Sequence, residues 1–343
     1  MEAIAAGATG RLPYRLPPQP SNPAMTASAR RQDAPFVHPE MAKIIAWYAS
    51  LGLPDTTKIP LAEARPITNR VSTHWNWPKP DMETVDLYIP GPTQALKARL
   101  FKPRPGKLPV LLYLHGGGWV FCDLDTHDRL MRMLALESGC AVLGLDYRLA
   151  PENPFPAGHD DAMAAVAWIR SDGAARGLDP SRIAVAGDSA GANLSLGVLV
   201  GLHEKGLPQI QGGALFYGCL APDHETESHK AFGGGAYNLT TERMRWFWKA
   251  WLGGTPAAPD IRAAPLLADM KGLPKLYLNA ASLDPLLDDT LRLAEKLKAA
   301  KVPHKMDIYD GVIHGFMNMS RELVLGRKAV ADAGRAIGDM LKA

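Results

Sequence analysis

The sequence predicts an α/β fold in which helices cover both faces of a mostly parallel sheet of eight strands. Short apolar runs recur from about residue 84 to residue 309, and between most of them apolar residues follow a helical spacing. Strands buried in a parallel sheet read as such continuous apolar runs, and the helices that connect them cover the two faces. The 343 residues are enough to bury one large core of this kind.

The strands and helices follow one another in a regular order. A Gly91-Pro92 turn joins the first two strands into an antiparallel pair, whereas helices separate the later strands. The expected strands are 84–90, 95–102, 110–114, 141–145, 182–186, 213–217, 275–280 and 304–309. The expected helices are 126–138, 160–175, 190–204, 287–300 and 322–341.

Two further apolar stripes fall outside this alternation. One helix is expected from Pro39 to Gly52, and another lies in an aromatic-rich interval at 219–262. Their apolar residues recur at helical spacing; they are Met41, Ile44, Ile45 and Tyr48 in the first stripe and Met244, Phe247, Trp248 and Trp251 in the second. The two stripes either form a cap over the active edge of the sheet or complete the core.

The composition is that of a globular protein that acts on small molecules. Hydrophobic residues make up 47% and charged residues 21%, and the net charge of +3 is too weak to indicate a nucleic-acid partner. Cys122, Cys140 and Cys219 are odd in number and lack C-x-x-C spacing, which argues against a disulfide framework and a zinc site. No signal sequence and no apolar stretch of membrane-spanning length is present, so we expect a cytoplasmic protein without membrane insertion.

The segment at 187–191 matches the pattern G-x-S-x-G, with Ser189 at its centre. An apolar strand precedes it, and a helix-compatible segment follows. Gly187 and Gly191 permit the sharp strand-to-helix turn that pushes the serine hydroxyl outward. Ser189 is therefore the expected nucleophile, in preference to a serine that only caps a helix after a glycine-rich turn.

A second glycine-rich loop follows the third strand and reads HGGGW at 115–119. Backbone N–H groups of such a loop can approach a ligand closely and form an oxyanion hole. The expected donors are Gly116 and Gly117, with the N–H of Ala190 as the third. A phosphate-binding loop is the alternative, but neither G-x-G-x-x-G nor a following lysine is present.

A serine nucleophile needs a base, and the ends of the last two strands supply the candidates. His314 lies in the loop after the eighth strand, and Asp284 follows the seventh. The chain order Ser, Asp, His is one of the known orders of a catalytic triad. Asp288 and Asp289 fall at the start of the next helix, where carboxylates favour the helix dipole. Asp284 is therefore the expected acid of the triad.

Five motifs together resemble the hormone-sensitive-lipase-like esterases, also called family IV of the bacterial lipolytic enzymes. They follow the family's order within roughly residues 75–320: HGGGW at 115–119, DYRLAPE at 146–152, GDSAGANL at 187–194, DPL at 284–286 and HGF at 314–316. The resemblance implies an α/β-hydrolase fold with a helical cap, no cofactor, and acyl esters of short to medium chain length as substrates. It also implies a homodimer, often formed through the edge of the last strand.

With such a cap, four segments are expected. An N-terminal arm and cap helices occupy 1–75, the first part of the core 76–218, the cap insertion 219–262 and the second part of the core 263–343. The first 36 residues mix Pro, Gly, Ser, Ala and Arg without sustained periodicity, so we expect a flexible or loosely packed arm there.

Four residues beside the motifs are expected to contact the substrate. Trp119 and Phe121 lie on the HGGGW loop and its continuation, Tyr217 ends a strand, and Asp188 precedes the nucleophile. Core packing is the alternative for the three aromatic residues. For Asp188 the alternative is hydrogen bonding to neighbouring loops.

Other residues near the motifs are expected to be structural. We expect Cys122 to be a small buried filler rather than a reactive thiol, and His115 to fix its loop through hydrogen bonds. Arg148 and Glu152 are expected to form structural pairs beneath that loop. His159 and the neighbouring aspartates read as a solvated surface cluster rather than a metal site, so no metal is expected.

The function that these residues indicate is a serine carboxylesterase that works through an acyl-enzyme intermediate. A lactonase or an amidase would use the same triad and the same tetrahedral chemistry. A non-catalytic ligand-binding protein, like the plant hormone receptors that resemble this family but have lost the triad histidine, is disfavoured because His314 is present.

Overall fold

The computed structural model describes residues 35–254 and 259–342, and the elements below all belong to the unit that begins at Phe36. The strands are β1 (Glu83–Pro90), β2 (Ala95–Lys102), β3 (Leu108–Leu114), β4 (Ala141–Leu145), β5 (Leu178–Asp188), β6 (Gly212–Phe216), β7 (Lys275–Leu283) and β8 (His304–Ile313). The α-helices are α1 (Pro39–Ser50), α2 (Leu61–Thr73), α3 (Asp128–Ser138), α4 (Ala157–Ser171), α5 (Ala190–Glu204), α6 (Glu227–Phe232), α7 (Thr241–Trp251), α8 (Leu287–Ala299) and α9 (Val324–Met340).

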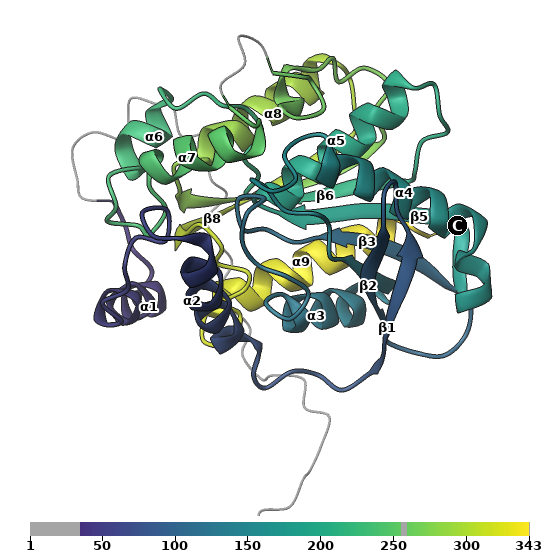
Figure 1. The fold of residues 1–343 in the computed structure, drawn as a ribbon, viewed down its shortest axis with the longest axis horizontal. Coiled ribbons are helices and arrows are strands. Elements are labelled where there is room, and N and C mark those ends of the chain that lie inside the picture. The colour runs from purple at the N-terminus through teal and green to yellow at the C-terminus, as the bar shows by residue number, and fades with distance from the viewer. Residues whose placement is uncertain (1–34, 255–258, 343) are drawn as a thin grey trace, which may run out of the picture. The chain divides into compact units, whose positions relative to one another are not determined.

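The strands of the described residues form one eight-stranded sheet in the order β1-β2-β4-β3-β5-β6-β7-β8 (Figure 1). β2 pairs antiparallel with both β1 and β4, and the remaining neighbours are parallel. The predicted α/β fold with a mostly parallel sheet is therefore confirmed. β5, β7 and β8 run further than predicted, so that Ser189, Asp284 and His314 each follow directly on a strand end.

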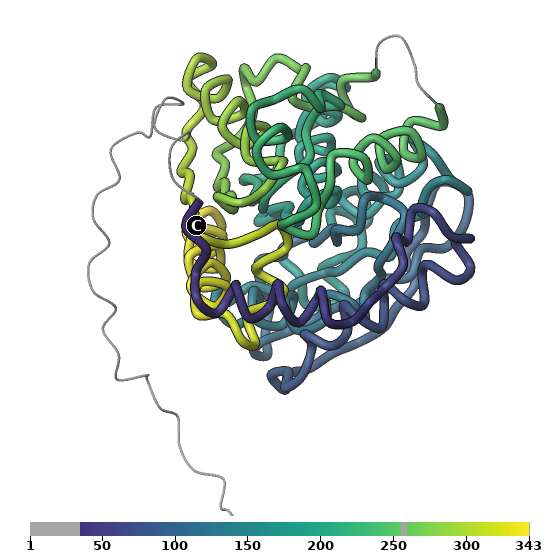
Figure 2. The backbone as a smooth tube through the Cα atoms, turned by 90° about the vertical axis from the view of Figure 1, so that its left-hand side faces the viewer, coloured from purple at the N-terminus to yellow at the C-terminus, as the bar shows by residue number. Residues whose placement is uncertain are grey.

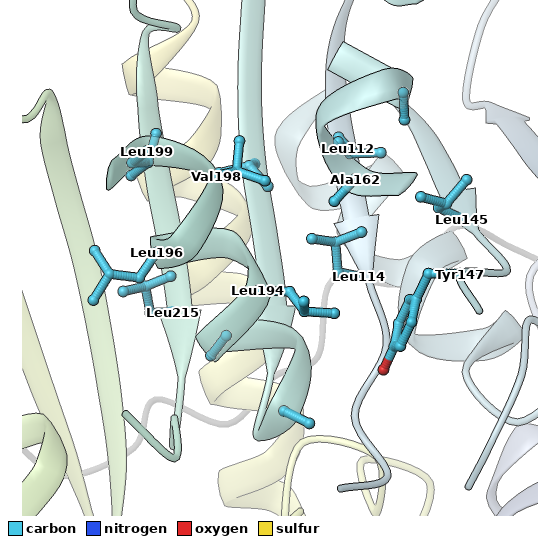
Figure 3. Packing of buried hydrophobic residues seen from close by; sticks show 14 of the residues in the cluster. Leu112, Leu114, Leu145, Tyr147, Ala162, Leu194, Leu196, Val198, Leu199 and Leu215 are labelled. Carbon is cyan, nitrogen blue, oxygen red and sulfur yellow. The ribbon is translucent and has the colours of Figure 1, made fainter. Parts of the chain in front are cut away.

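The core has two halves, one on each face of the sheet. On β3, Val110, Leu112 and Leu114 belong to one apolar cluster, whereas Leu111 and Tyr113 belong to the other. This alternation follows from the two-residue period of a strand. α4, α5 and α8 cover the first face, and α3 and α9 cover the second (Figure 1). Figure 3 shows leucines of α5 packed against β3 and β6 on the first face.

Helix α1 lies beside the C-terminal part of the chain (Figure 2). The backbone N–H of His38 donates to the carbonyl of Gly311 at 2.9 Å, and that of Val324 donates to the Glu40 carboxylate at 2.7 Å. The helix predicted from Pro39 is present as α1. Sequence reasoning missed α2, since Pro66 lies inside it and its burial is slight.

The segment 219–262 carries α6 and α7 and is anchored by the start of α8. The Asp289 carboxylate is 2% exposed and accepts backbone hydrogen bonds from Leu220 at 2.6 Å and Ala221 at 3.3 Å. The Asp288 carboxylate accepts one from Ser228 at 2.8 Å. Both aspartates, predicted only to favour the helix dipole, therefore also hold this segment on the core. Its apolar stripe on α7 packs into the cluster on the first face of the sheet.

Three further predictions concern the whole chain. The arm predicted at 1–36 lies almost wholly outside the described residues. Within the described part, no helix combines the length and the apolar character needed to cross a membrane. The three cysteines all belong to that part and are free thiols.

Candidate active site

Ser189 occupies a strained turn between β5 and α5. Its backbone has φ 54° and ψ −117°, a region that is costly for residues other than glycine, and its N–H donates to the Phe216 carbonyl at 2.9 Å. The turn is crowded, because a methyl group on Gly191 would lie 1.8 Å from the Leu114 carbonyl oxygen. The G-x-S-x-G pattern is thus a steric requirement of this elbow.

The three residues predicted as a catalytic triad meet in space. His314 Nε2 lies 2.9 Å from Ser189 Oγ, and His314 Nδ1 lies 2.7 Å from Asp284 Oδ2. The other oxygen of Asp284 accepts the N–H of Leu286 at 2.9 Å, and the carboxylate is fully buried. The imidazole is therefore held between an oriented carboxylate and the serine hydroxyl, the arrangement that prepares a serine for attack.

The HGGGW loop passes beside the elbow, but its N–H groups are used differently from the prediction. The N–H of Gly116 donates to Asp188 Oδ1 at 3.0 Å, so it is not available to an oxyanion. Gly117 and Gly118 have positive φ angles of 117° and 61°, and both line the same cavity as Ser189. The prediction of Gly116 as a donor is therefore wrong, and Gly117 and Gly118 are the glycines of this loop that reach the cavity.

Asp188 ties the elbow to the neighbouring strand and loop. In addition to Gly116, it accepts a hydrogen bond from Tyr113 Oη at 2.7 Å and lies 3.3 Å from His127 Nε2. Burial by itself would raise the pKa of Asp188, but His127 and the hydrogen bonds from Tyr113 and Gly116 hold that pKa at about 2. The side chain is thus a buried anion that fixes the loop, the alternative named for it, although it also touches the cavity.

The triad opens into a cavity of about 190 Å³ with two walls. We call the wall formed by the strand ends and the glycine-rich loop the catalytic wall; it contains Gly117, Gly118, Phe121, Cys122, Thr126, His127, Asp188, Ser189, His314, Gly315, Asn318 and Met319. We call the opposite wall the helical wall; it contains Tyr48, Thr68, Ser72, Trp75, Asn238, Leu239, Arg243, Met244 and Phe247. The helical wall comes from the N-terminal helices and from the segment 219–262.

Two of the four predicted substrate contacts reach this cavity. Phe121 and Asp188 line it, whereas Trp119 and Tyr217 fall outside the set of described residues that do. The ring of Trp119 is stacked on Trp251, with centroids 5.2 Å apart. Tyr217 places its ring edge-on against the imidazole of His314 at 5.1 Å. Core packing describes Trp119, and Tyr217 packs against the imidazole of His314.

His115 and its neighbours hold the start of the glycine-rich loop. Its Nδ1 lies 2.8 Å from the Gly116 carbonyl oxygen, and its own carbonyl accepts a hydrogen bond from Tyr147 Oη at 2.8 Å. Burial and the nearby His127 lower the pKa of His115 to about 4, so the ring is neutral at pH 7. These contacts agree with the loop-fixing role predicted for His115.

The charged residues of the DYRLAPE motif form ion pairs with other elements. Arg148 binds Asp161 at 2.7 Å, and Glu152 binds Arg65 of α2 at 2.7 Å. Arg65 also donates from Nε to the Val120 carbonyl at 3.0 Å, which fixes the far end of the glycine-rich loop. The expected structural pairing is therefore present, with partners that the sequence did not indicate.

Cys122 and His159 have environments that explain their chemistry. Burial and the nearby Asp188 raise the pKa of the Cys122 thiol to about 12, which leaves little reactive thiolate.

His159 and Asp161 are fully buried, so the prediction of a solvated cluster is wrong for them. His159 Nε2 lies 3.1 Å from the Gly197 carbonyl oxygen. No group of His, Cys, Asp or Glu side chains within the described residues is arranged to hold a metal ion.

Sequence reasoning missed most of the helical wall. Thr68 and Ser72 lie on α2, whose existence was not predicted, and Arg243 reads as an ordinary solvent-facing residue of an amphipathic helix. The signal that could have drawn attention to Arg243 is its position one residue before Met244 and one turn before Phe247, both in the apolar stripe.

Comparisons with known proteins show the family of this chain. A family model described as the alpha/beta hydrolase fold matches residues 111–318. An acetyl esterase of Salmonella schwarzengrund is 33% identical over 268 residues, which cover 76% of this chain and 81% of that protein. The esterase of Pyrobaculum calidifontis is 33% identical, with a TM-score of 0.86 and coverage of 89% of this chain and 98% of that one.

A thermostable esterase of Pseudomonas putida is 30% identical, with a TM-score of 0.85, and the match covers 91% of this chain and 100% of that one. The chain belongs to the α/β-hydrolase fold family, as one of its hormone-sensitive-lipase-like esterases.

Proposed function

We propose that this carboxylic ester hydrolase cleaves acyl esters through a covalent acyl-enzyme on Ser189. The observation that carries the proposal is the continuous chain from Asp284 through His314 to Ser189, with contacts of 2.7 and 2.9 Å, at the wall of a cavity. A serine hydroxyl is a weak nucleophile at neutral pH, and this arrangement supplies the base that it needs.

Acylation begins when Ser189 Oγ attacks the ester carbonyl and transfers its proton to His314 Nε2. Asp284 holds the imidazole in the required tautomer and stabilises the imidazolium that forms. The tetrahedral intermediate then collapses, the bond to the alcohol oxygen breaks, and His314 returns the proton to the leaving alcohol. In the second half-reaction, His314 activates a water molecule, which attacks the acyl-enzyme and releases the carboxylic acid.

The negative charge on the carbonyl oxygen is stabilised by backbone N–H groups. We propose Gly117, Gly118 and Ala190 as the donors, because the two glycines line the cavity beside Ser189 and Ala190 begins α5. The N-terminus of that helix adds a favourable dipole. Losing one such donor in a serine protease costs about 100- to 1,000-fold in kcat.

The proposed substrates are esters of short to medium chain length. The acetyl esterase among the relatives supports this range, and a cavity of about 190 Å³ has room for a small acyl group and its leaving alcohol. Each buried methylene adds about 0.8 kcal/mol until the space is filled. Rates for para-nitrophenyl esters from acetate to palmitate should therefore be highest for acyl chains of roughly two to eight carbons.

The direct test of the mechanism is Ser189→Ala, which removes the nucleophile and leaves the packing almost unchanged. We expect ester hydrolysis to fall to background while circular dichroism and the melting temperature stay as in the wild type. Hydrolysis at a rate comparable with the wild type would refute Ser189 as the nucleophile.

Three further proposals concern the cap, the oligomeric state and the cellular location of the protein. We propose that α1, α2 and the segment 219–262 act as the cap, because they supply the helical wall. A homodimer through β8 is proposed because that strand forms an edge of the sheet and carries the exposed Ile308. Light scattering tests it, and a monomer mass at micromolar concentration would contradict it. A cytoplasmic location is proposed from the free cysteines, and fractionation of the native cells tests it.

A further inference from the structure

Arg243 brings a positive charge into the wall of the catalytic cavity. It lies in the first turn of α7 and lines the cavity together with the next residue, Met244, and with Phe247 one turn later. An arginine keeps its proton at any ordinary pH, so the group contributes a permanent charge. Its neighbours in the cavity wall are apolar, whereas arginines usually lie among polar groups at the surface.

Within the described residues, no carboxylate forms a salt bridge with the guanidinium of Arg243, and the charge of Asp55 acts on it only at longer range. Its Nε is buried and has no hydrogen-bond partner within the described residues, and the contact of Nη2 with Thr56 Oγ1 is long, at 3.4 Å. Asp55 is close enough to interact electrostatically, but it is engaged by Thr57 at 2.8 Å and by Lys58 at 3.6 Å. Burial lowers the pKa of Arg243 from its ordinary value, which shows that desolvation outweighs the favourable interactions around it.

A neighbour on the same helix shows the contrast. Arg245 points to the surface and forms an ion pair with Glu225 at 2.9 Å. Buried charges in proteins are usually paired in this way, since an unpaired buried charge is costly. The missing partner of Arg243 is therefore expected to come from a molecule that enters the cavity.

Arg243 lies close to the glycine-rich loop that carries the proposed oxyanion donors, with the Phe247 ring as their shared neighbour. Its guanidinium carbon lies 5.9 Å from the centre of the Phe247 ring. That ring packs on the glycine-rich loop, because a methyl group on Gly118 would lie 2.2 Å from Phe247 Cδ1. Arg243 and Gly118, one of the proposed oxyanion donors, therefore both lie next to the Phe247 ring and line the same cavity as Ser189.

We propose that Arg243 binds a carboxylate of the substrate, so that the preferred substrates are esters that carry a carboxylate remote from the scissile bond. This inference rests on the proposed ester hydrolysis at Ser189 and names its substrate class. The carboxylate belongs either to the acyl part, as in a half-ester of a dicarboxylic acid, or to the alcohol part, as in an acylated hydroxy acid. Both use the same ion pair and hydrogen bonds from the guanidinium.

The test compares each anionic ester with a neutral ester of the same shape. In the first pair the carboxylate belongs to the acyl part, and we call this pair the acyl arm of the test. The anionic ester is the mono-para-nitrophenyl ester of adipic acid, and the neutral ester carries an amide in place of its free carboxylate. For the alcohol arm they are the acetate ester of a hydroxypentanoic acid and its amide. We expect wild-type kcat/KM to favour the anionic ester in one arm, by about ten- to a hundred-fold, the size of a charge-assisted hydrogen bond.

The substitution Arg243→Met should abolish that preference, so that the anionic and the neutral ester of a pair are hydrolysed with similar kcat/KM, because the long apolar side chain keeps the packing but carries no charge. Arg243→Lys should retain part of the preference, because it keeps the charge and loses the paired donors. Arg245→Met is the control on the same helix, and it should leave kcat/KM for both the anionic and the neutral esters unchanged. An equal response of anionic and neutral esters to Arg243→Met would overturn the proposal.

The wild-type comparison does not depend on whether a variant folds. If the wild-type enzyme has the same kcat/KM for the neutral and the anionic ester in both arms, the carboxylate subsite is refuted, but the proposed ester hydrolysis stands. If it hydrolyses none of the four esters and also fails on para-nitrophenyl acetate, the proposed function itself has failed. Arg243→Glu gives a further check, because it should turn the preference toward esters with a terminal ammonium group.

Discussion

The catalytic wall and the helical wall of the cavity are built in different ways. The catalytic wall follows from the sheet, because Ser189 and His314 each come directly after a parallel strand. Asp284, which contacts His314 behind this wall, also follows a strand, and the contacts among the three residues are short. The helical wall is assembled from α2 and α7, far apart in the sequence, and includes Arg243 with a buried nitrogen that has no partner among the described residues.

This difference indicates a division of work between chemistry and selection. A group that must act in every turnover is held by hydrogen bonds from elements of the core, which fix its geometry to a fraction of an ångström. A group that selects the substrate can remain without a partner until the substrate arrives. Changes in the catalytic wall should therefore alter kcat for all esters, and changes in the helical wall should alter the ranking of esters.

The largest effect is expected for Asp284→Asn. An amide cannot accept the imidazole N–H in the same way, so His314 loses the orientation and the stabilisation that the carboxylate gives. Steady-state assays on para-nitrophenyl acetate should show a loss in kcat of about 1,000- to 10,000-fold, as for the equivalent change in a serine protease.

Asp288→Asn is the matched control for that substitution. Asp288 lies on the same turn of chain but accepts its hydrogen bond from the backbone of Ser228, which an amide oxygen can also do. It should leave kcat close to the wild-type value. Equal losses in the two variants would mean that the carboxylate of the triad has been misassigned.

The next largest effect is expected for Gly191→Ala. The added methyl group would meet the Leu114 carbonyl at 1.8 Å, so the elbow must shift, and shifts of about 1 Å in a catalytic group cost on the order of 100-fold. The variant should also lose about 1 to 3 kcal/mol of unfolding free energy in urea titrations.

Gly234→Ala serves as the comparison for that variant, since nothing lies within 4 Å of a methyl group at Gly234. It should have wild-type activity and stability. If Gly191→Ala were equally silent, the turn would be more adaptable than its packing indicates.

The same division explains how far the sequence could predict this molecule. Strand ends are local in sequence, so the triad could be placed from apolar runs and the residues after them. Gly116 was misassigned because its N–H meets Asp188, 72 positions away, a contact with no local signal. Trp119 was misplaced because its ring stacks on Trp251 of α7, a contact between distant parts of the chain that has no local signal. The helical wall depends on α2 and on its docking, which periodicity did not indicate.

A smaller effect, confined to the ranking of substrates, is expected for Phe247→Leu. The smaller side chain enlarges the cavity at its helical wall. Acyl chains longer than the wild-type optimum should therefore gain about four-fold in kcat/KM for each additional methylene that fits. Acetate is too short to use the new space and acts as the internal control. A uniform loss for all chain lengths would show that Phe247 mainly supports the Gly118 loop.

The smallest effect on turnover is expected for Asp289→Asn, which probes the anchor of the segment 219–262. Burial raises the pKa of Asp289 to about 7, so the folded state favours the neutral acid. Its contribution to stability is present below the ordinary pKa of about 4 and is lost as the pH rises through 7. The asparagine is neutral throughout and can still accept the N–H of Leu220.

Thermal unfolding of the two proteins from pH 4 to pH 8 measures this effect. The difference in unfolding free energy, variant minus wild type, should increase with pH by about 1 to 3 kcal/mol, since one pKa unit corresponds to about 1.4 kcal/mol. A difference that stays constant with pH would show that Asp289 is charged at all these pH values.

The central claim, that His314 activates Ser189 for covalent catalysis, is tested most directly by labelling with a fluorophosphonate and mapping the adduct by mass spectrometry. The account predicts one adduct per chain, located on Ser189, with loss of activity in proportion to labelling. Labelling should be absent in Ser189→Ala and strongly slowed in His314→Gln. An adduct on Cys122 or on another serine, or full activity after Ser189 has been labelled, would contradict the account.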